Sequence, residues 1–339
     1  MPIDIVRDET GLARMAAEWN DLLAGAVSDV PFLRHEYVST WWSSLGGGEW
    51  PEGELCLVVD RGSDGRLLGI APLFRTGASA GESTLRLIGS REISDYLDVI
   101  VDRERHASFV EACLARLETE AWDILELDNV LEDSPTLPAM EAAAQQRGWA
   151  TSRARGKPCP LVHLEAGWEG YLARLDKKQR HELRRKMRRA EAHPSEIDVR
   201  HIRATDHPEA EVDRFLELMA TDPGKADFLT GPMRQHFHRL AKVGFERGWL
   251  ELSLLIVGGR PAAGYLDFVY RNRLWIYNSG LDPSFLALSP GWVLLGYVIQ
   301  AAAEAGMEAV DFLRGEEDYK TRLGGVPRFV GRLEIRRGK

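Results

Sequence analysis

The stretch from Leu274 to Lys320 constrains the fold of this chain more than any other. Residues 274–279 alternate around Trp and Tyr, a pattern that predicts a β-strand. Ser-Pro at 289–290 is typical of a helix start, and the helix is predicted to end before Gly306. The short apolar run 307–313 predicts a buried strand. The sequence thus predicts a strand, a loop, a helix and a second strand, followed by a polar loop.

This layout is typical of an anion-binding site. A strand that leads through a loop to a helix N-terminus directs free backbone N–H groups and the positive end of the helix dipole to one point. That point suits the pyrophosphate of a nucleotide cofactor. The polar loop Arg314–Lys320 then places titratable side chains at a strand end. A purely structural β-α-β unit with a solvated loop is the alternative, and the layout alone leaves both open.

A long and strongly basic helix is predicted over 168–192. Between Arg174 and Arg189 the chain has nine Lys or Arg residues and two acidic residues. Arg180, Arg184 and Arg188 are spaced by four, so they share one face of the helix. Guanidinium groups bind phosphate bidentately, so this face suits a phosphate-bearing donor or acceptor. A solvated helix face is the alternative.

The length of the chain indicates two domains. It has 339 residues, and the two prolines of Lys157–Pro160 suit a domain boundary. We therefore expect domains at 1–160 and 161–339. In each half, helices and an antiparallel meander are followed by a further helix and a terminal strand. This order predicts mixed α/β layers, each half with a mostly antiparallel central sheet flanked by helices.

Charge and hydropathy exclude several classes of protein. The net charge of −9 argues against DNA binding. No apolar run approaches the roughly 18 residues that span a bilayer, so membrane insertion is not expected. The N-terminus MPIDIVRDETG lacks the basic and apolar regions of a signal peptide, and we expect a cytoplasmic protein. Cys56, Cys113 and Cys159 have no metal-binding spacing and form no disulfide framework, and no metal is expected.

Several short motifs resemble those of GNAT acyltransferases in their order and spacing. They are Ser94–Asp98, Lys177–Arg185, Ser289–Gly291, Asp311–Gly315 and Tyr319–Lys320. The resemblance is to the cellulose-biosynthesis (CelD-like) branch, which is related to the Fem peptidyltransferases. It implies a tandem GNAT fold and acyl-transfer chemistry. One departure is the Arg/Gln-x-x-Gly-x-Gly/Ala phosphate loop of ordinary GNAT enzymes, of which only a single glycine is present here, near the helix start.

The resemblance and the chemistry of acyl transfer together imply three groups of site residues. Transfer from a thioester to an amine requires a base for the nucleophile, a donor to the oxyanion and an acid for the leaving thiolate. The candidate catalytic residues are Asp311, Glu316, Tyr319 and Lys320. The candidate cofactor-binding residues are Ser289, Pro290, Gly291, Trp292, Arg180 and Arg184. The candidate substrate-binding residues are Asp95, Tyr96, Asp98, Asp267, Tyr277 and Ser279.

The catalytic candidates have separate physical reasons. Glu316 opens a run of three acidic residues, whose repulsion favours a proton on one of them and hence a general base. Asp311 lies in an apolar strand, where a carboxylate is costly unless paired, and Arg314 is a candidate partner. Tyr319 suits an acid or an orienting group, and Lys320 matches a family position that implies charge compensation. A solvated loop, simple packing and a surface lysine are the alternatives.

These observations predict an acyltransferase, and more narrowly an N-acetyltransferase. It would move an acyl group from acetyl-CoA or another acyl-CoA to an amine on a sugar, peptide or envelope/exopolysaccharide precursor. A Fem-like transferase with aminoacyl-tRNA as donor is the first alternative, favoured by the missing glycine-rich loop and disfavoured by the acidic charge. A GNAT fold that only binds a partner or precursor is the second. tRNA is a partner only under the first alternative, and neither DNA nor a metal cofactor is expected.

Overall fold

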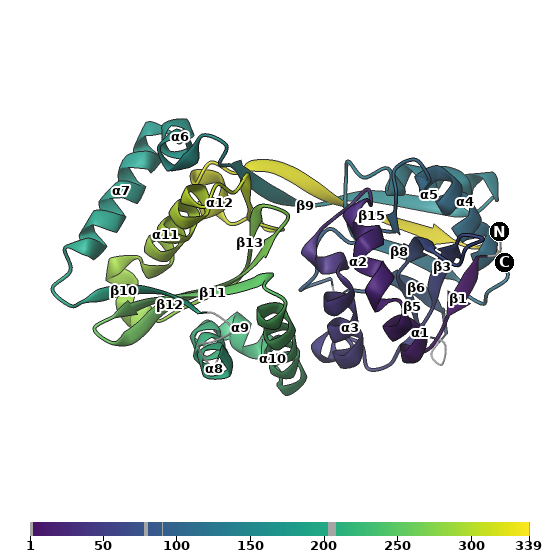
Figure 1. Cartoon of the computed structure of the whole chain (residues 1–339), viewed down its shortest axis with the longest axis horizontal. Coiled ribbons are helices and arrows are strands. Elements are labelled where there is room, and N and C mark those ends of the chain that lie inside the picture. The colour runs from purple at the N-terminus through teal and green to yellow at the C-terminus, as the bar shows by residue number, and fades with distance from the viewer. Residues whose placement is uncertain (1–2, 78–80, 90, 203–207, 339) are drawn as a thin grey trace. The chain divides into compact units, whose positions relative to one another are not determined.

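The computed structural model describes residues 3–77, 81–89, 91–202 and 208–338. Its contacts divide the chain into two compact units, Met1–Lys157 with Phe329–Lys339, and Pro158–Arg328 (Figure 1). The expected boundary near residue 160 thus corresponds to a division between Lys157 and Pro158. The end of the chain differs from the expected assignment to 161–339, because its last strand pairs with a strand of the first unit.

The second unit contains a sheet with the strand order β10-β11-β12-β13-β14-β9. Its strands are β10 (Ile197–Ile202), β11 (Leu250–Val257), β12 (Arg260–Tyr270), β13 (Arg273–Leu281), β14 (Ala309–Asp311) and the end of β9 (Ala150–His163). Neighbouring strands are antiparallel except for β13 and β14, which are parallel. The parallel pair forms because a helix carries the chain from β13 back to the start of β14.

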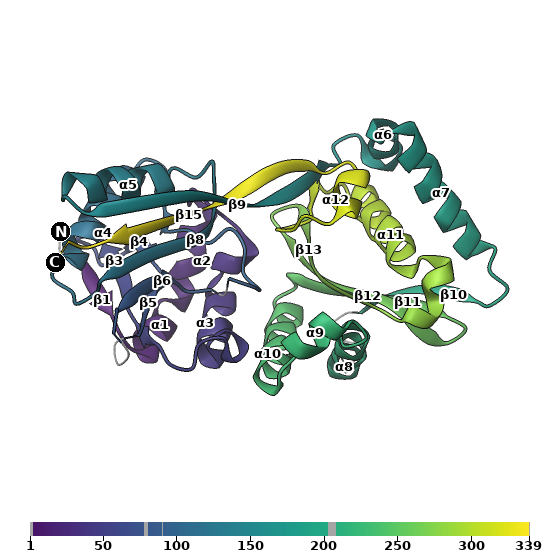
Figure 2. The same cartoon turned by 180° about the vertical axis from the view of Figure 1, so that it is seen from behind.

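Helices cover both faces of this sheet. One face carries α6 (Gly167–Arg174), α7 (Lys177–Glu191) and α11 (Pro290–Glu304) (Figures 1 and 2). The other carries α8 (Pro208–Met219), α9 (Pro223–Phe228) and α10 (Gly231–Glu246). The short elements η4 (Pro283–Leu288) and α12 (Asp318–Arg322) flank α11 and β14 in sequence. One buried apolar cluster joins α6, α7 and α11 to the strands beneath them.

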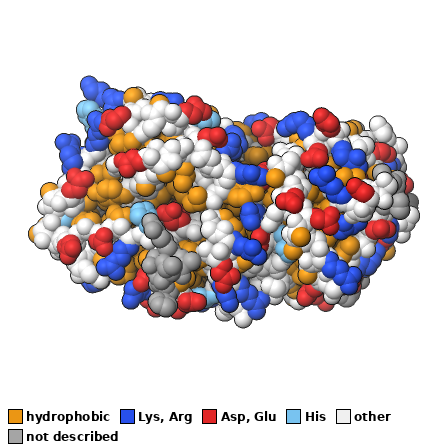
Figure 3. Space-filling view, viewed as in Figure 1, with side chains coloured by type: hydrophobic (Ala, Val, Ile, Leu, Met, Phe, Trp, Pro, Cys, Tyr) orange, Lys and Arg blue, Asp and Glu red, His pale blue; other side chains and the backbone are white. Residues whose placement is uncertain are grey.

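The single helix predicted over 168–192 is wrong, because the chain breaks between α6 and α7. Leu175 has an extended backbone, with ψ of 144°. Asp176 then caps α7, and its side chain accepts a hydrogen bond from Lys178 N at 2.8 Å. Leu183 and Met187 face the core. Lys and Arg side chains gather at the edge of the unit where Figure 1 places α7 (Figure 3).

The first unit contains two sets of strands. One sheet has the order β1-β3-β4-β7, and the second set has the order β15-β8-β6-β5-β2. The strands are β1 (Asp4–Val6), β2 (Glu54–Leu55), β3 (Leu57–Arg61), β4 (Leu67–Ala71), β5 (Leu73–Thr76), β6 (Thr84–Leu87), β7 (Ile100–Val101), β8 (Ile124–Leu131) and β15 (Val326–Arg336). The helices are α1 (Glu9–Arg14), α2 (Ala16–Ala24), η1 (Pro31–Leu33), α3 (His35–Ser44), η2 (Gly46–Gly48), α4 (His106–Leu117) and α5 (Thr136–Gln146).

Two expectations from composition can be compared with this architecture. Within the described ranges, no helix has both the length and the hydropathy needed to cross a membrane. Cys56, Cys113 and Cys159 are all buried. Burial raises the pKa of Cys56 to about 11 and that of Cys113 to about 12, so these two thiols are poor nucleophiles at neutral pH.

Candidate active site

The short helix η4 connects the end of β13 to the N-terminus of α11. The first hydrogen bond within α11 runs from Val293 N to Ser289 O at 3.1 Å. The backbone N–H groups of Gly291 and Trp292 precede this bond, so they have no partner within the helix. These two donors and the helix dipole form the anion-binding geometry that the sequence predicts.

Ser289 occupies the N-cap position, as predicted, with a left-handed backbone (φ 57°). Its hydroxyl accepts a hydrogen bond from Nζ of Lys186, on α7, at 2.8 Å. The same ammonium group lies 5.4 Å from the centre of the Trp292 ring. Lys186 therefore adds a full positive charge to the partial charge of the helix N-terminus.

Strands β13 and β14 separate close to this helix start. They pair in parallel only over Arg273–Trp275 and Ala309–Asp311. β13 continues to Leu281, whereas β14 ends at Asp311. Beyond Trp275, the backbone N–H and C=O groups of β13 that face β14 no longer pair with that strand. An extended ligand could use them, because such groups require a hydrogen-bonding partner.

A β-bulge distorts β13 just beyond this point. Leu266 is opposite Asn278 and Asp267 is opposite Ile276, so Tyr277 is the extra residue. The backbone N–H of Tyr277 donates to Oδ1 of Asp267 at 3.1 Å. Burial raises the pKa of the Asp267 carboxyl well above its usual range. Asp267 therefore holds the bulge in shape as a buried group that favours its neutral form.

Lys225 of α9 reaches the diverging part of β13. Its ammonium group donates to the backbone carbonyl of Ser279 and lies 3.4 Å from the hydroxyl of the same residue. Burial lowers the pKa of Lys225, against the opposing effects of Asp222 and Glu317. A partly desolvated cation thus lies beside the splayed strand and within electrostatic range of Glu317.

Asp311 fixes the beginning of the polar loop after β14. Its side chain is fully buried. Oδ1 accepts a hydrogen bond from Leu313 N at 2.9 Å, and Oδ2 accepts one from the Arg328 guanidinium at 2.7 Å. Arg328 therefore supplies a charged partner for this buried carboxylate, and the pairing with Arg314 suggested by the sequence stays a prediction. These contacts give Asp311 a positioning role.

Lys320 is buried beneath the same loop, with 3% of its surface exposed. Its Nζ donates to the carbonyl of Arg314 at 2.9 Å and lies 3.1 Å from Oε2 of Glu317. Gly315 makes this arrangement possible, because a β-carbon at its position, with φ of 151°, would overlap both Glu317 Oε2 and Lys320 Nζ. The loop is thus folded around the ammonium group of Lys320, which holds the Glu317 carboxylate at the surface.

Two tyrosines connect this loop to the start of α11. Tyr319 packs edge-on against Phe312, with ring centres 6.0 Å apart. Burial raises the pKa of Tyr319, and the charge of Glu317 adds to the effect. Tyr265 donates a hydrogen bond to the carbonyl of Gly291 at 3.3 Å, and burial raises its pKa well above the usual range. Both phenols therefore keep their protons at neutral pH.

The part of the chain that carries this arrangement matches a known family. Residues 177–321 match the family model described as an acetyltransferase (GNAT) domain. The matched GNAT domain begins at the first residue of α7 and ends within α12. No curated protein gives a significant sequence match to the chain.

The whole chain shares its fold with several solved structures. FemX is 13% identical, with a TM-score of 0.66 over 94% of this chain and 95% of that one. L-PGS from Bacillus licheniformis is 12% identical, with a TM-score of 0.56 over 98% and 93%. A tandem GNAT protein from the clavulanic acid biosynthesis pathway is 16% identical, with a TM-score of 0.50 over the full length of both chains. The predicted fold of tandem GNAT-like domains, each with a mostly antiparallel sheet, is confirmed.

Some predicted residues of the GNAT domain lie away from the Glu317–Lys320 pair and the start of α11. Glu316 is exposed and makes no hydrogen bond or ion pair with any described residue. Arg180 donates to a backbone carbonyl at the end of α6, at 3.4 Å. Arg184 also reaches α6, where it pairs with a glutamate at 2.7 Å. The basic side chain that reaches the start of α11 is instead that of Lys186.

The Ser94–Asp98 motif is a buried turn of the first unit. Asp98 is 1% exposed, and its carboxylate accepts hydrogen bonds from the Ser134 hydroxyl at 2.7 Å and from two further hydroxyls. Burial raises its pKa. Asp98 is therefore a structural anchor of the first unit, and the substrate contact predicted for it stays a prediction. Asp95 and Tyr96 are also buried, and the substrate contacts predicted for them stay predictions.

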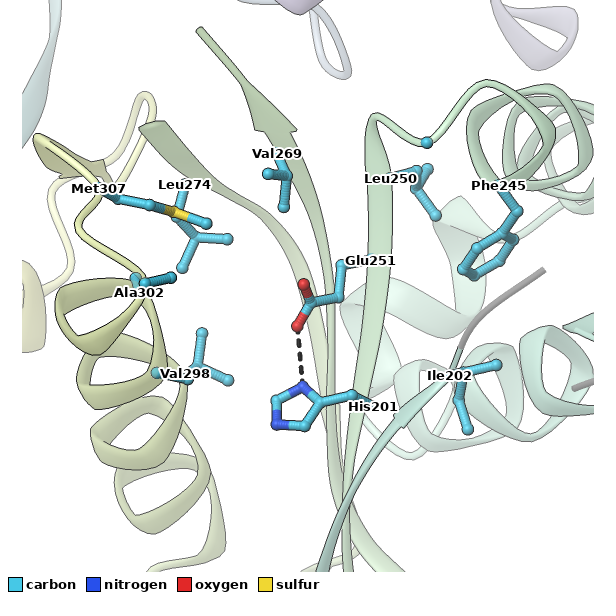
Figure 4. A pocket seen from close by; sticks show the side chains of 13 residues that line it. His201, Ile202, Phe245, Leu250, Glu251, Val269, Leu274, Val298, Ala302 and Met307 are labelled. Carbon is cyan, nitrogen blue, oxygen red and sulfur yellow. Dashed lines mark hydrogen bonds and ion pairs between the residues drawn. The ribbon is translucent and has the colours of Figure 1, made fainter. Parts of the chain in front are cut away.

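A pocket of about 490 Å³ lies at the other end of α11 (Figure 4). Val298 and Ala302 of the helix line it, and His201 and Glu251 approach each other to 2.8 Å on the sheet side. Helix α11 has 15 residues and is about 22 Å long, so this pocket is remote from the helix N-terminus.

Among the described side chains, no group of three or more His, Cys, Asp or Glu is placed to hold a metal ion.

The sequence missed two residues of the candidate site and left the choice of a third open. Lys225 contacts Ser279 across 54 residues, and no local pattern identifies such a contact. Lys186 belongs to the basic run, but its side chain leaves α7 on a different side from Arg184. Glu317 lies beside the predicted Glu316, and three consecutive acidic residues give no signal for which one the loop selects.

Proposed function

We propose that the GNAT domain transfers an acyl group from a coenzyme A thioester to an amine on a sugar, peptide or envelope/exopolysaccharide precursor. The observation that carries the proposal is the divergence of β13 and β14 beside the start of α11. At that point an anion-binding helix end, a bulged strand and the Glu317–Lys320 pair occur together. Together these groups can bind an anionic donor, stabilise an oxyanion and accept a proton, which are the tasks of an acyltransferase site.

The residues at the start of α11 fit the diphosphate of coenzyme A. The N–H groups of Gly291 and Trp292 and the ammonium group of Lys186 would hold it. A β-carbon added to Gly291 would meet only ordinary van der Waals contacts, so room remains along the helix end. Bound there, coenzyme A supplies the thioester and a thiolate leaving group.

The side chains of the loop after β14 suit the proton transfers. Glu317 is the exposed member of its pair and accepts the proton of the acceptor amine, as general base. The backbone N–H groups of β13 beside its bulge stabilise the oxyanion, while the new C–N bond forms and the C–S bond breaks. Tyr319 keeps its proton and donates a hydrogen bond to the leaving thiolate. Asp311 and Lys320 position the loop and touch no substrate.

A donor of the Fem type is the second candidate. FemX and L-PGS align over more than nine-tenths of this chain, each with a higher TM-score than the tandem GNAT protein. The glycine-rich phosphate loop of ordinary GNAT enzymes is also missing from the sequence. An aminoacyl-tRNA donor would carry an ester in place of the thioester, and the same base and oxyanion donors would serve it.

Thermal denaturation with and without acetyl-CoA tests the proposal. A ligand at about 100 times its Kd stabilises the folded state by roughly 2.7 kcal/mol, a shift of several degrees in Tm. Thiol release with a panel of amino sugars and peptide amines then measures transfer. A shift without thiol release would indicate a protein that only binds. No shift with acetyl-CoA, together with transfer from aminoacyl-tRNA, would replace the proposed donor by the second candidate.

A further inference from the structure

A groove of about 590 Å³ lies between α6, α7 and α11. Three guanidinium groups of α7 line it, those of Arg184, Arg185 and Arg188. The indole of Trp168 lines it from α6, and the amide of Gln300 lines it from α11. A volume in this range is typical of small-molecule sites.

Acidic partners compensate little of the positive charge of the three arginines. Arg184 pairs with Glu169 at 2.7 Å, but the two side chains are 44% and 76% exposed, so solvent screens the pair. Arg185 makes no hydrogen bond or ion pair with any described residue. Arg188 donates to a backbone carbonyl at 3.3 Å, which neutralises no charge. Glu191 is the acidic residue of the lining, and the groove remains cationic in a chain with a net charge of −9.

Trp168 supplies a planar apolar surface beside these charges. Its ring centre lies 5.4 Å from that of Tyr171, with an angle of 31° between the planes. Tyr171 is buried, and its hydroxyl donates to the carbonyl of Leu323 at 3.1 Å. The indole is therefore backed by a fixed ring. An aromatic side chain beside a cationic groove is the arrangement on which nucleobases stack.

We infer that this groove binds a nucleotide that carries two or more phosphate groups. Arg184, Arg185 and Arg188 hold the phosphates, because guanidinium groups match phosphate oxygens bidentately. Trp168 stacks on the base, and the amide of Gln300 offers both a donor and an acceptor to the base or the ribose. The inference goes beyond acyl transfer, since binding in the groove requires no reaction.

The groove is distinct from the anion site at the start of α11. Lys186 points to Ser289, whereas Arg184 reaches Glu169 on α6. A nucleotide in the groove has two chemical sources, a free nucleotide or the nucleotide end of an acyl-CoA. A free nucleotide presents its phosphates and base to the groove, whereas an acyl-CoA with its diphosphate at the start of α11 presents its 3′-phosphate and adenine to the same side chains. Binding experiments must therefore separate the two sources.

Calorimetric titration of the full chain with ADP tests the inference. Arg185→Gln/Arg188→Gln removes two charges that line the groove, while Lys178→Gln/Arg189→Gln removes two from the same helix outside it. We expect the ADP affinity to fall at least about tenfold in the first double variant and less than about threefold in the second. Trp168→Leu should weaken ADP binding more than pyrophosphate binding. Thermal denaturation of each variant checks that it is folded.

Equal losses in the two double variants, or no ADP binding by the wild type at millimolar concentration, would overturn the inference and leave a solvated basic face. Acetyl-CoA titrations identify the source. Competition with ADP, and loss of acetyl-CoA affinity in the groove variant, would assign the nucleotide end of the acyl donor. Simultaneous binding of both would assign a free nucleotide, and either result supports the groove. Binding of ADP without any binding of acetyl-CoA would support the groove while the proposed acyl donor fails.

Discussion

Nζ of Lys320 lies 3.1 Å from Oε2 of Glu317. The lysine side chain is 4% exposed, whereas the glutamate side chain is 56% exposed. The lysine is part of the core of the loop, and the glutamate is its chemically accessible end. A buried cation that holds an exposed carboxylate in one position suits a general base, because the carboxylate is oriented and accessible to a substrate.

Glu317→Gln should lower kcat for acyl transfer by about 10²- to 10⁴-fold, the usual contribution of a general base. It should also lower Tm, because it removes the charged partner of the buried Lys320, so kcat is compared below the Tm of the variant. Glu316→Gln is the matched control, since it removes the same charge from the neighbouring exposed position. We expect its kcat to stay within about threefold of the wild type. Steady-state kinetics with a fixed amine acceptor measures both, and equal losses in the two variants would reject Glu317 as the base.

Asp311→Ala should destabilise the chain strongly. It leaves the Arg328 guanidinium without its carboxylate, with 29% of the arginine side chain exposed, and removes the acceptor of Leu313 N. Loss of one partner of a buried pair costs about 3–5 kcal/mol, and partial exposure of the arginine reduces this to about 2–4 kcal/mol. Denaturant unfolding measures the change.

Asp318→Ala is the matched control for this experiment. Asp318 pairs with Arg322 at 3.1 Å, but the two side chains are 85% and 50% exposed. Pairs of this kind contribute little, so its unfolding free energy should change by less than about 0.5 kcal/mol. A similar loss in both variants would contradict the positioning role of Asp311.

Lys186→Gln should weaken acetyl-CoA binding, because it removes the charge that reaches Ser289 at the start of α11. A charge-assisted hydrogen bond contributes about 1.5–3 kcal/mol, so Kd should rise about 10- to 100-fold. Lys178→Gln, near the start of the same helix, should change Kd by less than about threefold. An unchanged Kd in Lys186→Gln would contradict binding of the coenzyme A diphosphate at this helix end.

Asp267→Asn should stabilise the chain at neutral pH but not in acid. Burial raises the pKa of the Asp267 carboxyl, so the folded state holds this proton more tightly than the unfolded state. From about pH 4, the ordinary carboxyl pKa, up to the raised value, the native state binds more protons and stability falls as pH rises. The neutral amide has no such dependence.

The difference in Tm between Asp267→Asn and the wild type should therefore grow from about pH 4 upward. Differential scanning calorimetry across this range measures it, and contributions of other titrating groups cancel in the difference. A difference that is constant with pH would show that the carboxyl at Asp267 does not titrate as its burial requires.

Local patterns predicted the elements of the GNAT domain better than they predicted its contacts. The helix start at Ser289 and the strand that ends at Asp311 follow from caps and apolar runs within a few residues. The break at Asp176 had a signal, since aspartate is a good N-cap, but the continuous helical pattern on both sides obscured it. Propensity within a window cannot detect a single capped turn that tertiary packing makes favourable.

The chemistry of the site depends on contacts that no local pattern encodes. A buried carboxylate at Asp311 implies a cation, and one such partner, Arg328, lies 17 residues away, beyond the reach of a local pattern. Lys225 meets Ser279 only because α9 is placed over the diverging strand. Asp98 is a further example, because the motif around it gives no sign of the three hydroxyl groups of the first unit that donate hydrogen bonds to its carboxylate.

The return of residues Phe329–Lys339 to the first unit means that this unit is interrupted by the second in sequence. Strand β8 pairs with β15, as in the contact of Leu131 with Val330, so the first unit needs a strand that follows the second unit in sequence. The segment Pro158–Arg328 is contiguous and is translated before Phe329–Lys339. The second unit can therefore complete its fold during synthesis, while the first unit must wait for the rest of β15 to close its sheet.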